Sequence, residues 1–509
     1  MRERVLTYLF NIVCTIFFVL LFYYSLTMTG YVPIDLSSEL ISFRQDNILI
    51  NCMWLIIAVI FGEMINTLIK KIRVRLNTRI IAAVVAVCSM FIAMFWVAGA
   101  NVLPDSDQWN VSFYANMFNL GDFSGFDKGK YIATCPHQLG IVTLLRIIYS
   151  IMGPDRFLGF RMLSVFGVGI IVYVGYEIVR KLTKQSVFAE ISYLLLCIFC
   201  FPLYIYTLFI YGEVLSTAVL FVAAWLLLSC LERFEWGKVV TLMVCSGLSV
   251  QLRQNSLVVL LGFLVVLFVK IIQEFNWKRM VMIVVIPLGI LAGNLFIDLI
   301  YHEHYKEDAF AIPNLLYIAM GTNWEEQNPG WFSRYNYTVF FENDCDPEAA
   351  SEVAMADLQE FIAHCVENPD YALEFYKEKF IAQWNDPMYH CLAMNCKVNY
   401  GEPQNPIVEN FYFGELRLLT EEFMNSYQLL VYGAILYWLI SGFRKDQKIE
   451  MHVLMVGIFG GFLFSLLWEA KTRYIFPYFI MMLPYAAMGI ENISHGVHEL
   501  FSIKFKNKK

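Results

Sequence analysis

The chain has 509 residues, of which 58% are apolar and only 16% are charged, and its mean hydropathy is +0.56. A soluble chain of this length carries charge on about a quarter of its residues, so the composition excludes an ordinary soluble protein. The net charge is −7, but this value averages an acidic region and a basic remainder of the chain. We expect no nucleic acid among the partners.

Apolar runs long enough to cross a bilayer recur along the chain and predict an all-α polytopic membrane protein of about twelve transmembrane helices. A helix of about 20 residues, rising ~1.5 Å per residue, covers the ~30 Å hydrocarbon layer. The expected spans are residues 5–28, 47–69, 80–100, 158–179, 187–205, 210–231, 239–252, 256–272, 281–301, 426–442, 451–468 and 475–492. The run 239–252 is short for a span. The first run lacks a small-residue cleavage site, so we expect an anchor and not a removed signal peptide.

Basic residues predict the orientation. With twelve crossings, the basic connections all fall on the side of the N-terminus. They contain Arg2 and Arg4; Lys70, Lys71, Arg73, Arg75 and Arg79; Arg180, Lys181 and Lys184; Arg233 and Lys238; Lys270, Lys278 and Arg279; Arg444, Lys445 and Lys448; and Lys504, Lys506, Lys508 and Lys509. The positive-inside rule makes that side cytoplasmic. We therefore expect a multi-pass cell-membrane protein with cytoplasmic termini and an extracytoplasmic active site.

The first external segment, residues 101–157, begins directly after the expected span 80–100 and carries two carboxylates, Asp105 and Asp107. Spacing alone is compatible with a solvated loop that caps a helix. The functional alternative is a general base or a metal ligand, because a carboxylate at an apolar boundary loses solvation and its pKa rises towards a useful value. This alternative would suit chemistry on a lipid-linked substrate.

Aromatic residues at helical spacing follow the two carboxylates, and the segment ends in an apolar run, 139–152, that is too short to span. We expect both to lie on the membrane surface as shallow helices. The stretch between them contains Tyr131, His137 and Gln138. His137 is equally compatible with a hydrogen-bonded structural histidine and with a contact to a phosphate or hydroxyl group.

Charged residues interrupt later apolar runs near the same side. Glu213 opens a span, Arg253 separates two spans, and Lys471 and Arg473 precede the last one. Each alone is compatible with an exposed hairpin tip or a boundary residue. Charge near the membrane core is expensive unless it is paired or hydrated. Their convergence at one depth, from distant parts of the chain, therefore favours a functional site.

The segment from His302 to Glu422 contains 22 of the 44 acidic residues and six basic ones, so it carries about −16 and the remainder about +9. It is expected outside, with one helix opening at Asp346-Pro347 and another at Asn368-Pro369. The expected division of the chain is 1–79 with two spans, 80–301 with the transmembrane core and the loop 101–157, 302–425 as a larger mixed external region, and 426–509 with three spans and a basic tail.

With these residues in view, the chain resembles the GT-C class of polytopic glycosyltransferases, which includes protein O-mannosyltransferases and the transferases that decorate lipid A with aminoarabinose. Asp107-Gln108, outside a span and before an aromatic-rich helix, is similar to the Asp-Glu or Asp-x-Asp element of that class. Residues 131–140 are similar to its aromatic–Pro–polar–Gly element. Gln108 stands where Glu is common, which leaves the roles of Asp105 and Asp107 exchangeable.

Later segments extend the resemblance. Tyr211-Gly-Glu213, Arg253-Gln-Asn255 and Glu469-Ala-Lys-Thr-Arg-Tyr474 are similar to recurring segments of bacterial members. Most of residues 80–490 follows the order of the class, with two additional spans before the carboxylates. The resemblance implies a cell-envelope hexosyl- or pentosyltransferase that takes a sugar from a polyprenyl-phosphate donor and not from a nucleotide.

The resemblance also implies roles. Asp107 is expected to remove the proton of an acceptor hydroxyl on a glycan, lipid or protein, and attack opposite the phosphate would invert the anomeric carbon. The groups expected to bind substrate or stabilise the departing phosphate are Tyr131, His137, Gln138, Glu213, Arg253, Lys471 and Arg473. Asp105 is expected to orient Asp107 or to bind a divalent cation, which two carboxylates would suit. No cofactor is certain.

Two other functions fit part of the pattern. A transporter or flippase of lipid-linked or polar solutes would also need about twelve spans, but the chain has no duplicated half with matching interruptions. A sensor or assembly scaffold would use the acidic external region as its binding module.

Overall fold

The structure is a computed structural model that describes residues 2–34, 40–71, 77–305, 310–324, 328–397, 404–444 and 447–506. Of the basic residues used to predict the orientation, Arg73, Arg75, Lys445, Lys508 and Lys509 lie outside the described residues.

The described chain is almost entirely helical. The first half contains α1 (Arg2–Thr27), β1 (Met28–Tyr31), β2 (Ser42–Gln45), α2 (Ile48–Lys71), α3 (Thr78–Ala100), α4 (Asp107–Asn119), α5 (Tyr131–Thr134), α6 (Leu139–Met152), α7 (Phe157–Leu182), α8 (Val187–Phe199), α9 (Phe201–Ile205), α10 (Glu213–Glu232), α11 (Trp236–Leu252) and α12 (Ser256–Gln273). The second half contains α13 (Trp277–Tyr301), α14 (Asn314–Met320), α15 (Tyr335–Glu342), α16 (Pro347–Glu367), α17 (Pro369–Trp384), α18 (Pro406–Phe413), α19 (Glu415–Gly442), α20 (Val453–Leu467) and α21 (Phe476–Lys506). The strands β1 and β2 form an antiparallel hairpin.

Nine helices among the described residues are long and apolar enough to cross a membrane, and a bent pair would make ten. The bent pair is α8 with residues 201–208, where the chain turns by 60° and Pro202 begins the second helix. Two of the twelve expected runs, 239–252 and 475–492, form α11 and α21, which are not among the nine. The class of an all-α polytopic membrane protein is confirmed, whereas the number twelve is not.

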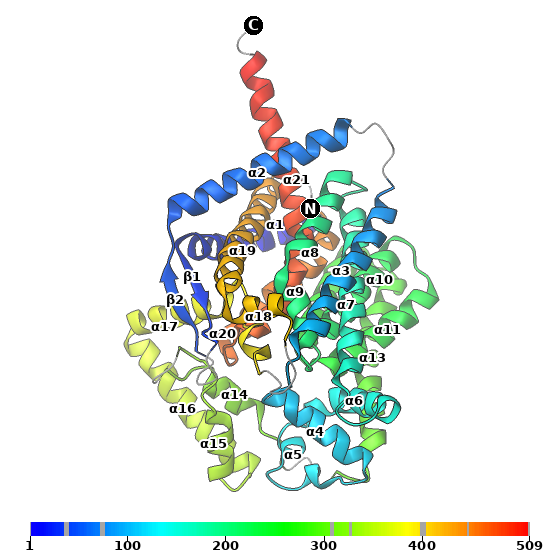
Figure 1. Ribbon diagram of the computed structural model, residues 1–509, viewed down its shortest axis with the longest axis vertical. Helices are drawn as coiled ribbons and strands as arrows, with labels where there is room; N and C mark the ends of the chain where they lie inside the picture. Colours follow the sequence, from blue (N-terminus) through cyan, green and yellow to red (C-terminus); the bar gives the residue numbers. More distant parts are fainter. Residues whose placement is uncertain are drawn as a thin grey trace.

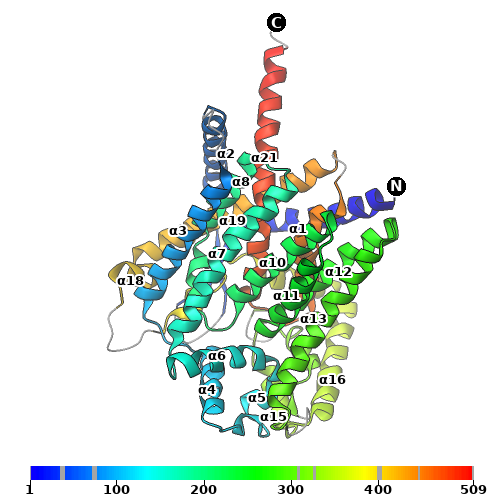
Figure 2. The same ribbon diagram turned by 90° about the vertical axis from the view of Figure 1, so that its right-hand side faces the viewer.

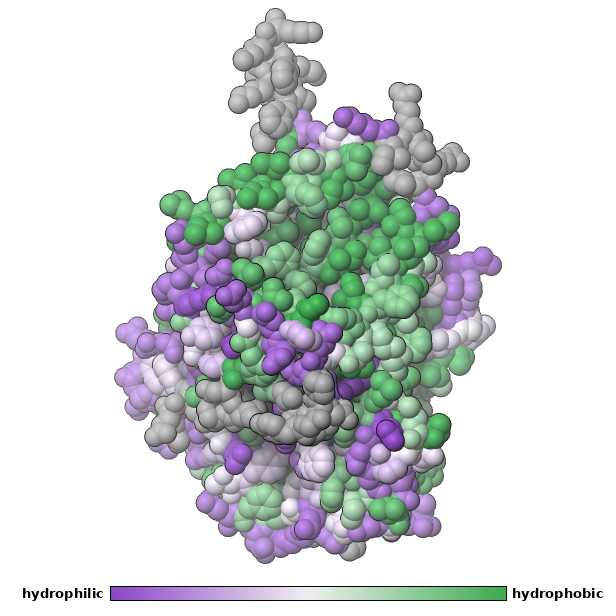
Figure 3. All heavy atoms as spheres, viewed as in Figure 1, coloured by the Kyte–Doolittle hydropathy of each residue, from purple (hydrophilic) through white to green (hydrophobic). Residues whose placement is uncertain are grey.

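The surface helices gather at one end of the molecule. Figures 1 and 2 show α4, α5 and α6 beside α15 and α16 at the end opposite the C-terminus. In Figure 3 hydrophobic side chains dominate the upper part of this face, and hydrophilic side chains gather at the lower end. The polar end therefore contains the helices that follow the two carboxylates.

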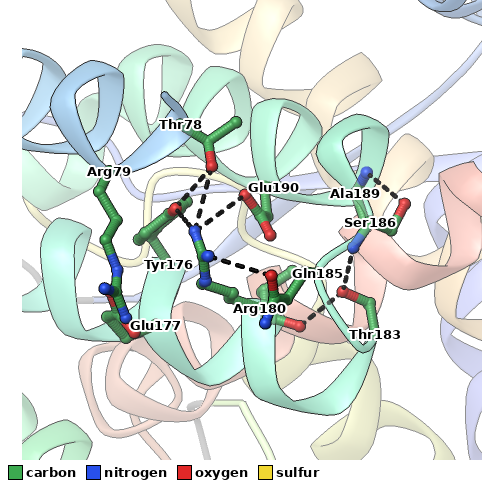
Figure 4. Close-up of polar contacts among 11 residues, drawn as sticks. Thr78, Arg79, Tyr176, Glu177, Arg180, Thr183, Gln185, Ser186, Ala189 and Glu190 are labelled. Carbon is green, nitrogen blue, oxygen red and sulfur yellow. Dashed lines mark hydrogen bonds and ion pairs between the residues drawn. The ribbon is translucent and has the colours of Figure 1, made fainter. Parts of the chain in front are cut away.

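A polar cluster marks the other end of α3. Thr78 shares a hydrogen bond of 2.8 Å with Tyr176 of α7, and Arg180 donates to both hydroxyls. Glu190 of α8 lies 3.9 Å from the same guanidinium and is buried, and Figure 4 shows the four side chains pointing towards one another. Because α3 has 23 residues, its two ends lie ~34 Å apart, and Asp107 follows the end opposite this cluster.

The centre of the bundle is built around α10, the most buried of the candidate spans. Its neighbour α11 lies very close to α13, since a Cβ added to Gly289 would lie 2.0 Å from the carbonyl oxygen of Met243. Small residues permit such a close approach of helices in a membrane. The connection between α11 and α12, which contains Arg253, lies against the start of α10, since a Cβ added to Gly212 would lie 2.3 Å from the carbonyl oxygen of Leu252.

Candidate active site

Asp107 is the first residue of α4, where a carboxylate is favoured by the helix dipole. Its Oδ2 lies 3.4 Å from Nη2 of Arg473, and its Oδ1 accepts a hydrogen bond of 3.3 Å from the hydroxyl of Tyr131. The Asp107 side chain is 32% exposed, whereas that of Arg473 is 5% exposed. The carboxylate therefore lies between solvent and a buried guanidinium.

Arg473 comes from a short 3₁₀ helix, Thr472–Tyr474, between α20 and α21. Its guanidinium carbon lies 5.3 Å from the ring centroid of Tyr474 and 5.4 Å from that of Tyr211. Burial opposes the charge, but Tyr474 and Asp107 outweigh burial and hold the pKa of Arg473 well above its ordinary value. The guanidinium therefore stays charged in a buried aromatic setting, where its field is weakly screened.

A second ion pair lies beside the first. Arg253 Nη2 is 3.4 Å from Oε1 of Glu213, the first residue of α10, and both side chains are mostly buried. Burial opposes the charge of Arg253 and Glu213 favours it, with the result that its pKa is raised. The Arg253 guanidinium also lies 4.7 Å from the Tyr211 ring centroid. Tyr211 thus lies within cation–π distance of both guanidiniums and links the two pairs.

Tyr211 is fixed in place by the surface segment. Its hydroxyl accepts a hydrogen bond of 2.6 Å from Nε2 of Gln138 and lies 3.5 Å from the hydroxyl of Tyr131. Both partners come from the segment that precedes α6, so residues 131–138 hold in place the ring that contacts the two arginines. Tyr131, Gln138 and Asp107 therefore meet, although they come from different parts of the first external segment.

Several buried polar atoms of this cluster make no hydrogen bond to the described residues. They are both carboxylate oxygens of Glu213, Oε2 of Glu469 and Nε of Arg473. Buried polar groups in folded proteins are almost always hydrogen-bonded. Of these atoms, Nε of Arg473 is a donor and the carboxylate oxygens are acceptors, and Oε1 of Glu213 lies at ion-pair distance from Arg253.

The segment 469–474 adds two further charges. Glu469 is buried and accepts a hydrogen bond from the Tyr474 hydroxyl, and burial raises its pKa despite the nearby Lys471. Lys471 is also buried, and its ammonium lies 4.1 Å from the Phe332 ring centroid.

Asp105 and His137 are placed differently from the rest. Asp105 pairs at 3.2 Å with Lys397, and both side chains are 47% exposed. His137 has an exposed side chain. The structure therefore brings together Asp107, Tyr131, Gln138, Glu213, Arg253 and Arg473, with Lys471 on the adjoining segment and Asp105 turned to another partner.

Gln108 explains why Asp107 and not Asp105 faces the arginines. The Gln108 side chain is buried, accepts a hydrogen bond of 2.9 Å from the backbone N–H of Ile210 and donates to the carbonyl of Met394 at 3.2 Å. These bonds attach the start of α4 to the segment before α10 and to the short helix Ala393–Asn395. Gln108 therefore has a structural role that an acidic residue, which has no N–H to donate, would not fill.

Three aromatic side chains that contact the arginines, Phe209, Tyr211 and Tyr474, were not predicted from the sequence. A signal was present, because Tyr211 and Tyr474 lie within two residues of a charged site residue in the sequence. Local spacing could not show that Tyr211 serves two arginines more than 200 residues apart.

Comparisons with known proteins give a single faint likeness. No family model matches the chain, and no curated protein matches it. The chain is similar to a solved structure described as the crystal structure of ArnT from Cupriavidus metallidurans bound to undecaprenyl phosphate. The identity is 11%, the match covers 81% of this chain and 77% of that chain, and the TM-score is 0.34. The function is therefore inferred from the contacts of this chain's own residues.

Proposed function

We propose that this protein is a membrane glycosyltransferase that moves a sugar from a polyprenyl-phosphate donor to an acceptor hydroxyl. The observation that carries the proposal is the meeting of a half-exposed carboxylate, Asp107, with two mostly buried guanidiniums, Arg473 and Arg253, around the ring of Tyr211. A carboxylate can act as the base for an attacking hydroxyl, and two nearby guanidiniums can stabilise the charge on a departing phosphate. The arrangement therefore suits transfer of a group from a phosphate to a hydroxyl.

In the proposed reaction the acceptor O–H gives its proton to Oδ1 or Oδ2 of Asp107. The acceptor oxygen then forms a bond to the anomeric carbon while the bond from that carbon to the donor phosphate oxygen breaks. The electron pair of the broken bond stays on the lipid phosphate. The products are an inverted glycoside, a polyprenyl phosphate and a protonated Asp107, which returns its proton to water.

The two arginines would bind the phosphate on which negative charge develops. Guanidinium groups can grip phosphate oxygens with two parallel hydrogen bonds. Nε of Arg473 has no hydrogen-bond partner among the described residues, which leaves it able to donate to such a ligand. Asp107 lies only at the long end of bonding distance from Arg473, so a phosphate can compete for this guanidinium.

A divalent cation does not fit the carboxylates well. Asp105 and Asp107 make ion pairs with different cationic side chains, Lys397 and Arg473. No group of three His, Cys, Asp or Glu residues suitable for a metal occurs within the described ranges. Two carboxylates already paired with cations are a poor ligand set for a hard metal ion, and we propose no step that passes through a metal.

The test compares matched aspartates in purified protein reconstituted into nanodiscs. Asp107→Asn should reduce transfer from a polyprenyl-phosphate sugar by about 10³-fold. Asp105→Asn should stay near wild type, because an exposed ion pair contributes little. Binding of a polyprenyl phosphate, measured against the corresponding polyprenol, should survive in Asp107→Asn and weaken in Arg473→Met.

Undiminished transfer by folded Asp107→Asn protein would remove this residue from the mechanism. Movement of the lipid between leaflets without any glycosidic product would favour a transporter or flippase. Equal binding of polyprenol and polyprenyl phosphate would contradict the role proposed for the arginines.

A further inference from the structure

A buried lysine lies behind the candidate active site. Lys379 of α17 is 1% exposed, and its Nζ donates hydrogen bonds to the carbonyl oxygens of Gly321, Leu466 and Trp468 at 2.5, 3.0 and 2.9 Å. Burial acts to lower the pKa of Lys379 to about 7, and Glu469 opposes this effect. Three acceptors complement the ammonium form, because an uncharged amine has only two N–H groups.

Two of the three acceptors lie at the end of α20. The last carbonyls of a helix lack partners within the helix and carry the negative end of its dipole. An ammonium bound to the carbonyls of Leu466 and Trp468 therefore stabilises this helix end. The next residues are 469–474, which contain Glu469, Lys471 and Arg473.

Other contacts of α17 act on the same helix end. One turn after Lys379, Nε2 of Gln383 donates to the carbonyl of Ser465 at 3.3 Å. Trp384 Nε1 lies 3.4 Å from the Ser465 hydroxyl oxygen and donates to it. One face of α17 thus holds the last turn of α20 from residue 465 to residue 468.

The third acceptor joins an external loop to the same point. Gly321 precedes Gly330, whose carbonyl accepts a hydrogen bond of 2.7 Å from the backbone N–H of Ala470. A Cβ at Gly330 would lie 2.9 Å from Cε of Lys379 and 2.4 Å from the Gly321 oxygen. The backbone at Gly321 and Gly330, the lysine and the segment 466–470 are therefore tightly packed, with no room for a side chain at Gly330.

We propose that Lys379 is a positioning residue of the candidate active site. Its ammonium fixes the end of α20 and so sets the direction in which the backbone continues to Lys471 and Arg473. The effect passes through backbone carbonyls. The identity of the ligand, a lipid-linked phosphate, rests on the proposed function.

The experiment compares Lys379→Met with Lys377→Met in full-length protein in nanodiscs. Lys377 lies on the same helix with an exposed side chain, so its variant removes the same charge without opening the contacts. In Lys379→Met, amide hydrogen exchange of peptides covering 466–474 should accelerate about tenfold, and the affinity for polyprenyl phosphate should fall by about tenfold, or ~1.4 kcal/mol. Lys377→Met should match wild type in both measurements.

Lys379→Arg provides a second variant if Lys379→Met does not fold. It retains the positive charge and several N–H donors, and its exchange and affinity should lie between those of wild type and the values expected for Lys379→Met. A lysine needed only for folding would reduce the amount of folded protein and leave the affinity of the folded fraction unchanged.

Two results would overturn the proposal. One is unaltered exchange of 466–474 in the folded Lys379 variants, and the other is faster exchange with unaltered phosphate affinity. If wild-type protein itself shows no phosphate-dependent lipid binding, the proposed function fails, and the exchange measurement still decides whether Lys379 holds the segment.

Discussion

At the scale of single residues, the candidate site depends on charges that compensate one another inside the protein. Glu213 and Arg253 are both mostly buried, and neither would be tolerated there without an opposite charge. The same holds for Arg473, whose guanidinium is paired with the carboxylate of Asp107. Removal of one member of a pair should therefore cost more than removal of both.

Glu213→Gln should destabilise the protein by ~3 kcal/mol, because it leaves the guanidinium of Arg253 buried without its carboxylate. The double variant Glu213→Gln with Arg253→Met should recover part of this loss. Thermal unfolding in detergent measures both effects. A double variant less stable than the sum of the single variants would contradict the pairing.

Asp386, in the turn after α17, provides a pH-dependent contribution. Burial raises its pKa to about 6 from the usual 3.8, against hydrogen bonds donated by the N–H of Met388, the hydroxyl of Thr472 and the N–H of His390. The folded state therefore binds the proton more tightly than the unfolded chain does. The resulting stability is fully present below pH 3.8 and is lost as the pH rises through about 6.

Between about pH 5 and pH 7.5 the contribution of Asp386 should fall by ~1.4 kcal/mol. The free energy of unfolding of wild-type protein, measured in detergent, should show this decrease in addition to the contributions of other titratable groups. The variant Asp386→Asn should lack it. If the free energy of unfolding changes equally between the two pH values in wild type and in Asp386→Asn, Asp386 does not titrate in this range.

At the scale of elements, α11, the helix that ends just before Arg253, packs closely against α13. The carbonyl oxygen of Met243 on α11 leaves no space for a side chain at Gly289 of α13. Gly237 lies on α11 as well, and a Cβ added there would meet nothing within 4 Å. The two glycines form a matched pair for a substitution test.

Gly289→Ala should destabilise the protein by ~2 kcal/mol, because backbone atoms must move to accept the methyl group. Gly237→Ala should be neutral or slightly stabilising, since alanine favours a helix more than glycine does. Unfolding temperatures of the two variants in detergent provide the measurement. Equal temperatures would show that α11 and α13 are not tightly packed.

Elements with strong local signals were predicted well from the sequence. The Asp346-Pro347 pair predicted the start of α16, and Asp346 accepts hydrogen bonds from the N–H groups of Glu348 and Ala349. The short apolar run 139–152 corresponds to α6. The count of spans was less accurate, because hydropathy does not reveal the 60° bend between α8 and α9.

At the scale of the whole molecule, the two ends of α3 are expected on opposite sides of the membrane. The cluster of Thr78, Tyr176 and Arg180 lies at one end, and Asp107 follows the other (Figures 1 and 4). The basic connections favour a cytoplasmic position for the first end. Asp107 is then expected on the outer face.

Impermeant maleimide labelling of cysteine variants in intact cells tests this orientation. Ser106→Cys, beside Asp107, should be labelled from outside, and Lys184→Cys should react only after permeabilisation; both positions are exposed. Wild-type protein controls for its own cysteines. The reverse pattern would place the candidate site on the cytoplasmic face.

The convergence of charges was the part of the site that the sequence indicated, because charged residues near a bilayer need partners. The pairing itself was not predictable. Arg473 meets Asp107 across 366 positions of sequence, and Asp105 meets Lys397 across 292. Which aspartate faces the arginines depends on how Gln108 attaches α4 to the rest of the molecule.

The contact of both Arg253 and Arg473 with the Tyr211 ring affects the stiffness of the site. Two like charges held near one ring repel each other, and this repulsion is built into the site when no anion lies between them. An anion bound between them would add two attractions that outweigh this repulsion. Occupancy by an anion should therefore stiffen the junction of α10, α12 and α21, and this junction should be most compliant when the site is empty.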